Sequence, residues 1–109
     1  MKLILAIVQD KDSNRLANEF IDANIRATKL SSTGGFLKAG NSTFIIGVDD
    51  ERVEATLELI KKTCQSRKQF VSTPVTLDLS MDSQIPYPVE VEVGGSTVFV
   101  LPVEGFHQY

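Results

Sequence analysis

Two amphipathic helical patterns, each placed between strand-like segments, constrain the fold of this 109-residue chain more than any other feature. The apolar run Leu3–Val8 predicts a central strand that is covered on at least one face. Apolar residues then recur at helical spacing over residues 16–21, which predicts a helix that ends near Asn24. Residues 25–30 alternate in polarity and predict a second strand.

The middle of the chain repeats this order. Thr43–Val48 predicts a third strand, and apolar residues at helical spacing over 53–64 predict a second helix that ends near Ser66. Acidic and hydroxyl side chains before each helix are expected to act as N-caps, namely Asp12 or Ser13 for the first and Asp49 or Asp50 for the second. Residues 65–86 are polar and proline-containing, and we expect a long irregular connection there.

The C-terminal part predicts a hairpin. Valines alternate with glutamates over residues 89–93, Gly94-Gly95 supplies a two-residue turn, and residues 97–103 return. The complete order predicts one α+β domain over residues 1–109, a ferredoxin-like (βαββαβ) sandwich with an added C-terminal hairpin. One sheet face of such a sandwich has no helices, so its apolar residues predict burial against another subunit in a homo-oligomer.

Composition excludes several classes of function. A net charge of -3 disfavours DNA or RNA as a partner, because affinity for nucleic acids depends on cationic contacts to phosphates. The single cysteine, Cys64, allows no intramolecular disulfide and no cysteine metal cluster, and it is expected on the buried face of the second helix. With His107 as the only histidine, no metal or other cofactor is expected. The apolar run at the N-terminus is too short for a signal peptide or membrane span, so we expect a cytoplasmic protein without membrane insertion.

Residues 24–41, NIRATKLSSTGGFLKAGN, carry the densest chemistry of the chain. Arg26 and Thr28 lie two residues apart on one strand face, and a guanidinium is well suited to bind a phosphate. Gly34-Gly35 lets the backbone approach a ligand, and Phe36 offers a face on which a base can stack. Taken singly, Arg26 also suits a surface ion pair, Gly34-Gly35 a turn and Phe36 a core position. Together they indicate a site for a small, flat, anionic molecule such as a nucleotide.

Five other positions have more than one interpretation. Asn41 suits a turn or an amide contact to adenine, and Gly47 weakens its strand, which indicates a close approach to the backbone. Phe99 and Phe106 are core or interface residues first and ligand neighbours second, and Glu92 suits a solvated strand face better than an acid–base pair.

Three long motifs carry a family resemblance: AIVQDKDS at 6–13, RATKLSSTGGFLKAGNSTF at 26–44 and IPYPVEVEVGGSTVFVLPVEGFHQY at 85–109. In these motifs the chain resembles the cyclic-di-AMP receptor family of PII-like signal-transduction proteins, over essentially its whole length. The resemblance implies a homotrimer that binds cyclic-di-AMP in the clefts between subunits and has no established catalytic activity. Carried over by position, it implies ligand contacts from Asn24, Arg26, Ala27, Thr28, Gly35, Phe36, Leu37, Asn41, Gly47, Phe99 and Gln108, with Glu92 as a weaker candidate.

The leading hypothesis is therefore a non-enzymatic second-messenger receptor. Cyclic-di-AMP would order the two long loops, and an unidentified downstream protein would recognise the changed surface. Two alternatives stay open at this point. One is a small phosphate-ester or acyl-phosphate hydrolase on a ferredoxin-like fold, and the other is a single-strand RNA binder that uses sheet aromatics.

Overall fold

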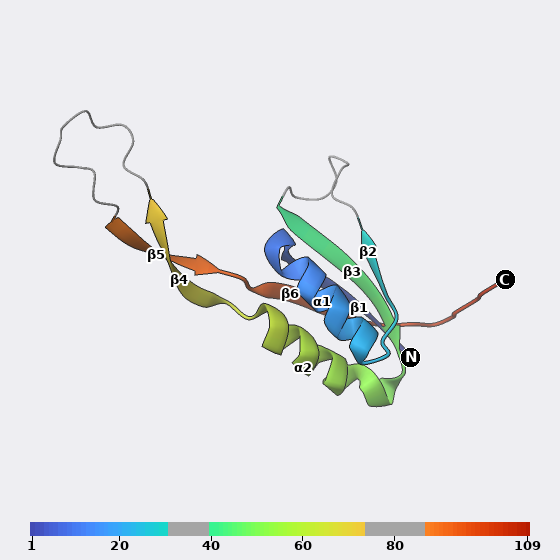
Figure 1. Ribbon diagram of the computed structural model, residues 1–109. Coiled ribbons are helices and arrows are strands. Elements are labelled where there is room, and N and C mark those ends of the chain that lie inside the picture. The colour runs from blue at the N-terminus through green and yellow to red at the C-terminus, as the bar shows by residue number, and fades with distance from the viewer. Residues whose placement is uncertain (31–39, 74–86) are drawn as a thin grey trace.

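The computed structural model describes residues 1–30, 40–73 and 87–109 and has an α+β architecture (Figure 1). Two helices cover one face of a four-stranded antiparallel sheet, and a separate pair of strands projects from this body (Figure 1). The elements are β1 (Lys2–Gln9), α1 (Asp10–Asp22), β2 (Ala27–Leu30), β3 (Asn41–Val48), the 3-10 turn η1 (Asp50–Arg52), α2 (Val53–Cys64), β4 (Arg67–Thr73), β5 (Tyr87–Val93) and β6 (Ser96–Pro102).

The strand order of the larger sheet is β2-β3-β1-β6, so β1 lies at its centre. Leu5 of β1 pairs with Ile45 of β3 on one side and with Phe99 of β6 on the other, and both pairings are antiparallel. The predicted α+β class is confirmed, and this order is compatible with a small ferredoxin-like fold.

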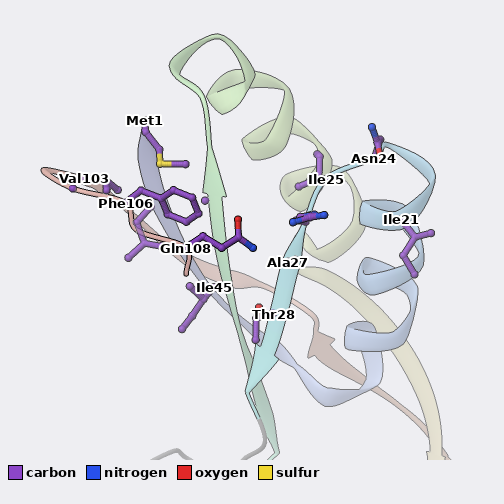
Figure 2. Close-up of a pocket in the computed structure, with 14 residues that line it drawn as sticks. Met1, Ile21, Asn24, Ile25, Ala27, Thr28, Ile45, Val103, Phe106 and Gln108 are labelled. Carbon is purple, nitrogen blue, oxygen red and sulfur yellow. The ribbon is translucent and has the colours of Figure 1, made fainter.

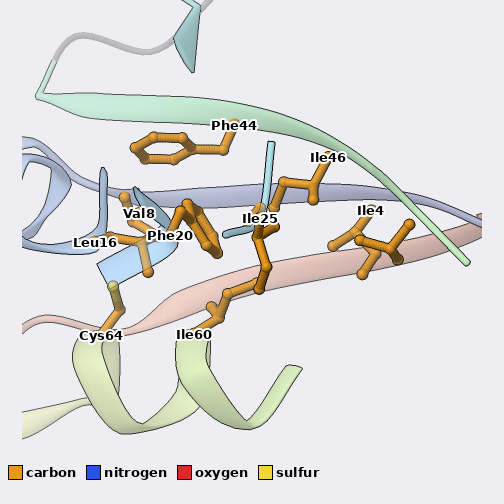
Figure 3. Packing of buried hydrophobic residues seen from close by; sticks show 11 residues of the cluster. Ile4, Val8, Leu16, Phe20, Ile25, Phe44, Ile46, Ile60 and Cys64 are labelled. Carbon is orange, nitrogen blue, oxygen red and sulfur yellow. The ribbon is translucent and has the colours of Figure 1, made fainter. Parts of the chain in front are cut away.

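The core lies between this sheet and the helices (Figure 3). Alternate residues of β1, Ile4, Ala6 and Val8, are fully or almost fully buried, because successive side chains of a strand point to opposite faces. Phe20 of α1 packs edge-on against Phe44 of β3, with ring centroids 5.6 Å apart. Such pairs add to the stabilisation from apolar burial, and they hold α1 against the sheet.

Among the described residues, no helix covers the opposite face of the sheet. Leu3, Leu5 and Ile7 are half-buried there, while Phe99 is 50% and Leu101 is 41% exposed. Strand pairing places these five residues side by side on one face, which we call the bare sheet face. In the described part of the chain these side chains form one contiguous apolar surface.

The start of α1 differs from the prediction. The helix begins at Asp10, directly after β1, and its N-cap is Gln9, with no side-chain cap hydrogen bond. Asp12 and Ser13, expected as caps, lie inside the helix and are buried. The Ser13 hydroxyl donates to the Asp10 carbonyl, and the Asp12 carboxylate accepts from Arg67. The expected caps are therefore wrong, and both side chains make other hydrogen bonds within or onto the helix.

The predicted C-terminal hairpin is wrong. The strands on either side of Gly94-Gly95 form, but β5 pairs with β4 and β6 pairs with β1. The two glycines, at φ +81° and +97°, adopt backbone conformations that favour glycine and carry the chain from one sheet to the other. Their N–H groups bond to the body instead of closing a turn, Gly94 to Gln9 Oε1 at 2.8 Å and Gly95 to the Cys64 carbonyl at 2.7 Å.

β4 and β5 form a two-stranded arm that extends away from the body (Figure 1). β4 lies in the segment that we expected to be irregular, because its first residues are largely polar and show no apolar alternation. Arg67 anchors the arm, with its Nη2 2.9 Å from Oδ1 of the buried Asp12. This hydrogen bond raises the pKa of Arg67. Burial raises the pKa of the neighbouring Cys64 thiol to about 11, and the predicted burial of Cys64 is confirmed.

Candidate functional site

A pocket of about 1040 Å³ lies at the end of the sheet, where the α1–β2 corner, β3 and the C-terminal tail meet (Figure 2). Its walls come from segments that are distant in sequence. The lining residues are Met1, Leu3, Ile21, Asn24, Ile25, Arg26, Ala27, Thr28, Ile45, Gly47, Val103, Gly105, Phe106 and Gln108.

The α1–β2 corner has the hydrogen bonds of a Schellman motif. Asn24 has a φ of +57°, its N–H donates to the Ile21 carbonyl at 3.0 Å, and the Ile25 N–H donates to the Phe20 carbonyl at 2.8 Å. Asparagine is the residue that best replaces glycine in this left-handed conformation. Ile25 and Phe20 are both buried in the core, which completes the motif. Asn24 thus shapes the pocket wall through its backbone and also borders the pocket.

Arg26 and Thr28 follow this corner, and both are exposed. Strand alternation places them on one face, as predicted, and both line the pocket. Thr28 pairs with Ile45 of β3, so an apolar side chain borders its hydroxyl group. Ala27, between them, packs against the core and also borders the pocket. The guanidinium and the hydroxyl can therefore reach the same bound anion.

Gly47 of β3 forms part of the wall opposite the corner and pairs with Leu3. A Cβ atom at Gly47 would meet no heavy atom closer than Met1 Cε, at 3.9 Å. The glycine therefore leaves space that a side chain would occupy, in keeping with the expected approach of a ligand to this backbone.

The tail forms the remaining wall. The Val103 N–H donates to the Met1 carbonyl at 3.4 Å, after which the chain leaves the sheet. Gln108 lies across β3 with its amide on the side of β2, and Phe106 lies beside Met1 and Val103 (Figure 2). Phe106 is largely exposed, so its ring is accessible from the pocket.

The turn η1 lies next to the pocket, and its charged residues Asp50 and Arg52 both make contacts there. The Met1 amine is 3.0 Å from Asp50 Oδ1, and this contact lowers the pKa of Asp50. Arg52 donates to the carbonyls of the α1–β2 corner. In the part of the chain that the structure describes, no group of three His, Cys, Asp or Glu residues could hold a metal ion, and no helix is long and apolar enough to cross a membrane.

Several predicted contacts do not line this pocket. Asn41 pairs with Gln9 at the far end of β3, Phe99 lies on the bare sheet face, and Glu92 accepts a hydrogen bond from Ser66 at the base of the arm. Gly35, Phe36 and Leu37 fall outside the described residues. The structure brings together six of the predicted residues: Asn24, Arg26, Ala27, Thr28, Gly47 and Gln108.

Sequence reasoning missed the apolar part of the lining. Ile45 and Leu3 lie on the bare sheet face, and strand alternation combined with the position of Gly47 could have identified them. Phe106 was predicted as a core or interface residue first and a ligand neighbour second, and it lines the pocket. Ile21 and Ile25 belong to the helix end, and their place beside the pocket follows from the turn at Asn24.

The arrangement combines one guanidinium, a hydroxyl, two carboxamides and apolar walls that include an aromatic ring. A set of this kind suits a ligand with both an anionic group and flat apolar faces, since few polar groups set orientation and apolar walls supply contact area. Nucleotides have this combination.

Comparison with known proteins agrees with this chemistry. The family described as cyclic-di-AMP receptor matches residues 1–109 of the chain. A crystal structure of a functionally unknown protein from Pediococcus pentosaceus ATCC 25745 is similar, with 53% sequence identity and a TM-score of 0.78. That match covers 99% of this chain and 96% of the other. The chain therefore belongs to the cyclic-di-AMP receptor family.

Proposed function

We propose that this protein is a non-enzymatic cytoplasmic receptor that binds cyclic-di-AMP in the pocket beside the α1–β2 corner. The family is a receptor family and is not known as an enzyme family. The observation that carries the proposal is that Arg26 and Thr28 of one segment and Gln108 of the distant tail line the same pocket. Arg26 would bind a phosphate of the cyclic dinucleotide, and Thr28 would donate a hydrogen bond to it.

The apolar walls would hold the bases. Ile45 supplies apolar contact area, and Phe106 supplies an aromatic face. Aromatic stacking contributes roughly 1–3 kcal/mol per base in single-stranded nucleic-acid complexes. The sequence-based contacts Gly35, Phe36 and Leu37 stay part of the proposal, since the chain leads into them directly after β2. Phe36 would then add a second stacking face.

The bare sheet face supports a homotrimer as the functional form. Its exposed residues Phe99 and Leu101 gain from burial against another copy, and Ile45 and Thr28 connect this face to the pocket. A neighbouring subunit that covers the face would also border the pocket. The proposed contacts Phe99, Asn41 and Glu92 would then reach the ligand from a neighbouring copy, which accounts for their distance from the pocket of their own chain.

Signalling would follow from a change in the segments beside the ligand. We propose that cyclic-di-AMP orders the two long loops expected from the sequence and that a downstream protein prefers the ordered state. A ligand shifts such an equilibrium only by its difference in affinity for the two states.

Calorimetric titration with cyclic-di-AMP tests the proposal, with cyclic-di-GMP and ATP as control ligands. We expect saturation at about one cyclic-di-AMP per chain, and light scattering should give the mass of a trimer. Arg26→Ala should weaken binding at least about tenfold, the equivalent of one charge-assisted hydrogen bond. Lys68→Ala removes an exposed cation of the arm and should leave affinity unchanged.

The absence of saturable binding to cyclic-di-AMP would contradict the proposed ligand. Binding by Arg26→Ala with the affinity of the parent protein would show that the assigned pocket is wrong even though the ligand is right.

A further inference from the structure

Arg52 of η1 binds the corner that forms one wall of the pocket, although it does not line the pocket itself. Its Nη2 lies 2.8 Å from the Ala23 carbonyl oxygen, and its Nη1 lies 3.1 Å from that of Asn24. The two terminal nitrogens of one guanidinium thus donate to consecutive carbonyls. A planar fork can make two such bonds at once, whereas an ammonium group is a single point charge.

The Ala23 carbonyl belongs to the C-cap of α1, and the Asn24 carbonyl belongs to the residue that follows it. The last carbonyls of a helix have no partner within the helix and carry the negative end of its dipole. The last turn of α1 contains no basic residue of its own. Arg52 supplies the missing cation from a different element.

The backbone of Arg52 is itself fixed. Its N–H donates to the Asp49 carbonyl at 2.9 Å, and its carbonyl accepts from the Thr56 hydroxyl at 2.8 Å. η1 follows β3, which carries Gly47 of the opposite pocket wall. Arg52 therefore connects the two walls of the pocket through a short and well-anchored path.

We propose that Arg52 is a positioning residue for the ligand pocket, an inference that rests on the proposed function of that pocket. By holding the carbonyls of Ala23 and Asn24, it fixes the direction in which the chain enters β2 and thus the place of Arg26 two residues later. β2 has four residues and pairs with β3 along one edge, so its entry point is set largely at this corner. A wall held in its binding conformation before the ligand arrives avoids the cost of ordering on binding.

Arg52→Ala tests this, and Arg15→Ala is a matched control. Arg15 of α1 also donates to a helix-terminal carbonyl, that of Thr63 at 2.6 Å, and so joins α1 to the end of α2 away from the pocket. Both variants should lower the melting temperature. Only Arg52→Ala should raise the Kd for cyclic-di-AMP, by about fivefold to tenfold. Arg52→Lys should lie between the parent protein and Arg52→Ala.

A double variant shows whether Arg52 acts through Arg26. If it does, Arg52→Ala should weaken binding much less in an Arg26→Ala background than in the parent protein, because interacting positions are not additive. Amide hydrogen exchange of the ligand-free protein gives an independent readout. Arg52→Ala should speed exchange at residues 26–28, and Arg15→Ala should not.

Equal loss of affinity in Arg52→Ala and Arg15→Ala would overturn the inference, as would unchanged exchange at residues 26–28 in Arg52→Ala. If the parent protein does not bind cyclic-di-AMP, the proposed ligand is wrong. The exchange comparison then still decides whether Arg52 fixes this wall of the pocket.

Discussion

The body and the arm are both built from antiparallel strands, yet they are stabilised in different ways. In the body, β1 has a neighbour on each side and a core above it, in which Phe20 and Phe44 are buried. In the arm, β4 and β5 pair with each other alone within the described residues, and Phe70 is 70% exposed. An isolated two-stranded sheet is marginally stable in water, so the arm depends on its attachment to the body.

That attachment is polar. Arg67 reaches the buried Asp12, and the N–H groups of Gly94 and Gly95 bond to Gln9 and to the Cys64 carbonyl. The comparison shows that apolar burial determines where the strands of the body lie, whereas a few directed hydrogen bonds determine where the arm lies.

The largest difference in stability is expected when one phenylalanine of the body and one of the arm are each replaced by alanine. Phe20→Ala should lower the free energy of unfolding by about 3–5 kcal/mol, because it leaves a cavity in the core. Phe70→Ala should change it by less than about 0.5 kcal/mol, since an exposed ring makes few contacts in the described structure. Urea unfolding followed by circular dichroism measures both. Similar losses in the two variants would show that the arm has a core of its own.

Asp12→Asn tests the attachment of the arm. The carboxylate accepts from Arg67 Nη2 at 2.9 Å and from Nη1 at 3.4 Å, and an amide of the same size cannot replace its charge. We expect a loss of about 1.5–3 kcal/mol in urea unfolding, as for hydrogen bonds to charged groups. We also expect faster proteolysis within the arm.

Lys68→Ala is the control for this loss, because it removes an exposed ion pair with Glu90 inside the arm. It should cost at most about 0.5 kcal/mol. A loss as large as that of Asp12→Asn would mean that pairing within the arm, rather than its attachment, limits its stability.

Two glycines allow the smallest and sharpest test. Gly40 and Gly94 both have positive φ, but a Cβ atom at Gly40 would meet no atom of the described residues within 4 Å. At Gly94 it would lie 2.5 Å from Arg67 Nη1 and 2.7 Å from the Gln65 carbonyl oxygen. Both alanine variants suffer backbone strain, so the difference between them isolates the crowding at the base of the arm. We expect Gly94→Ala to cost about 1 kcal/mol more than Gly40→Ala, measured by thermal unfolding.

The body could be predicted from sequence because its apolar periods match its burial. Leu3–Val8 is the central strand, and the helical spacing of residues 53–64 is α2. The arm could not be predicted, because valines alternating around a Gly-Gly pair describe a hairpin as well as a crossing between two sheets. The choice between these depends on Gln9, which is 85 residues from Gly94 and carries no sign of this role in its local sequence.

The candidate site likewise contains residues that could be predicted from the sequence and residues that could not. Arg26 and Thr28 could be predicted because strand alternation alone places them on one face. Ile45 could not, because its part in the pocket depends on how β3 and the tail come together. The role of Arg52 could not be predicted for a related reason, since it depends on a contact with carbonyls 28 and 29 residues away.

The arm also has a hydrodynamic consequence. The described chain measures 66 × 29 × 20 Å and has a radius of gyration of 18.6 Å, whereas a compact domain of this length has about 13 Å. Friction in solution depends on such extension, so a single chain should elute from a sizing column ahead of a compact protein of 12.0 kDa. Elution volume alone would therefore overstate the number of copies in an assembly, and mass should be measured by light scattering.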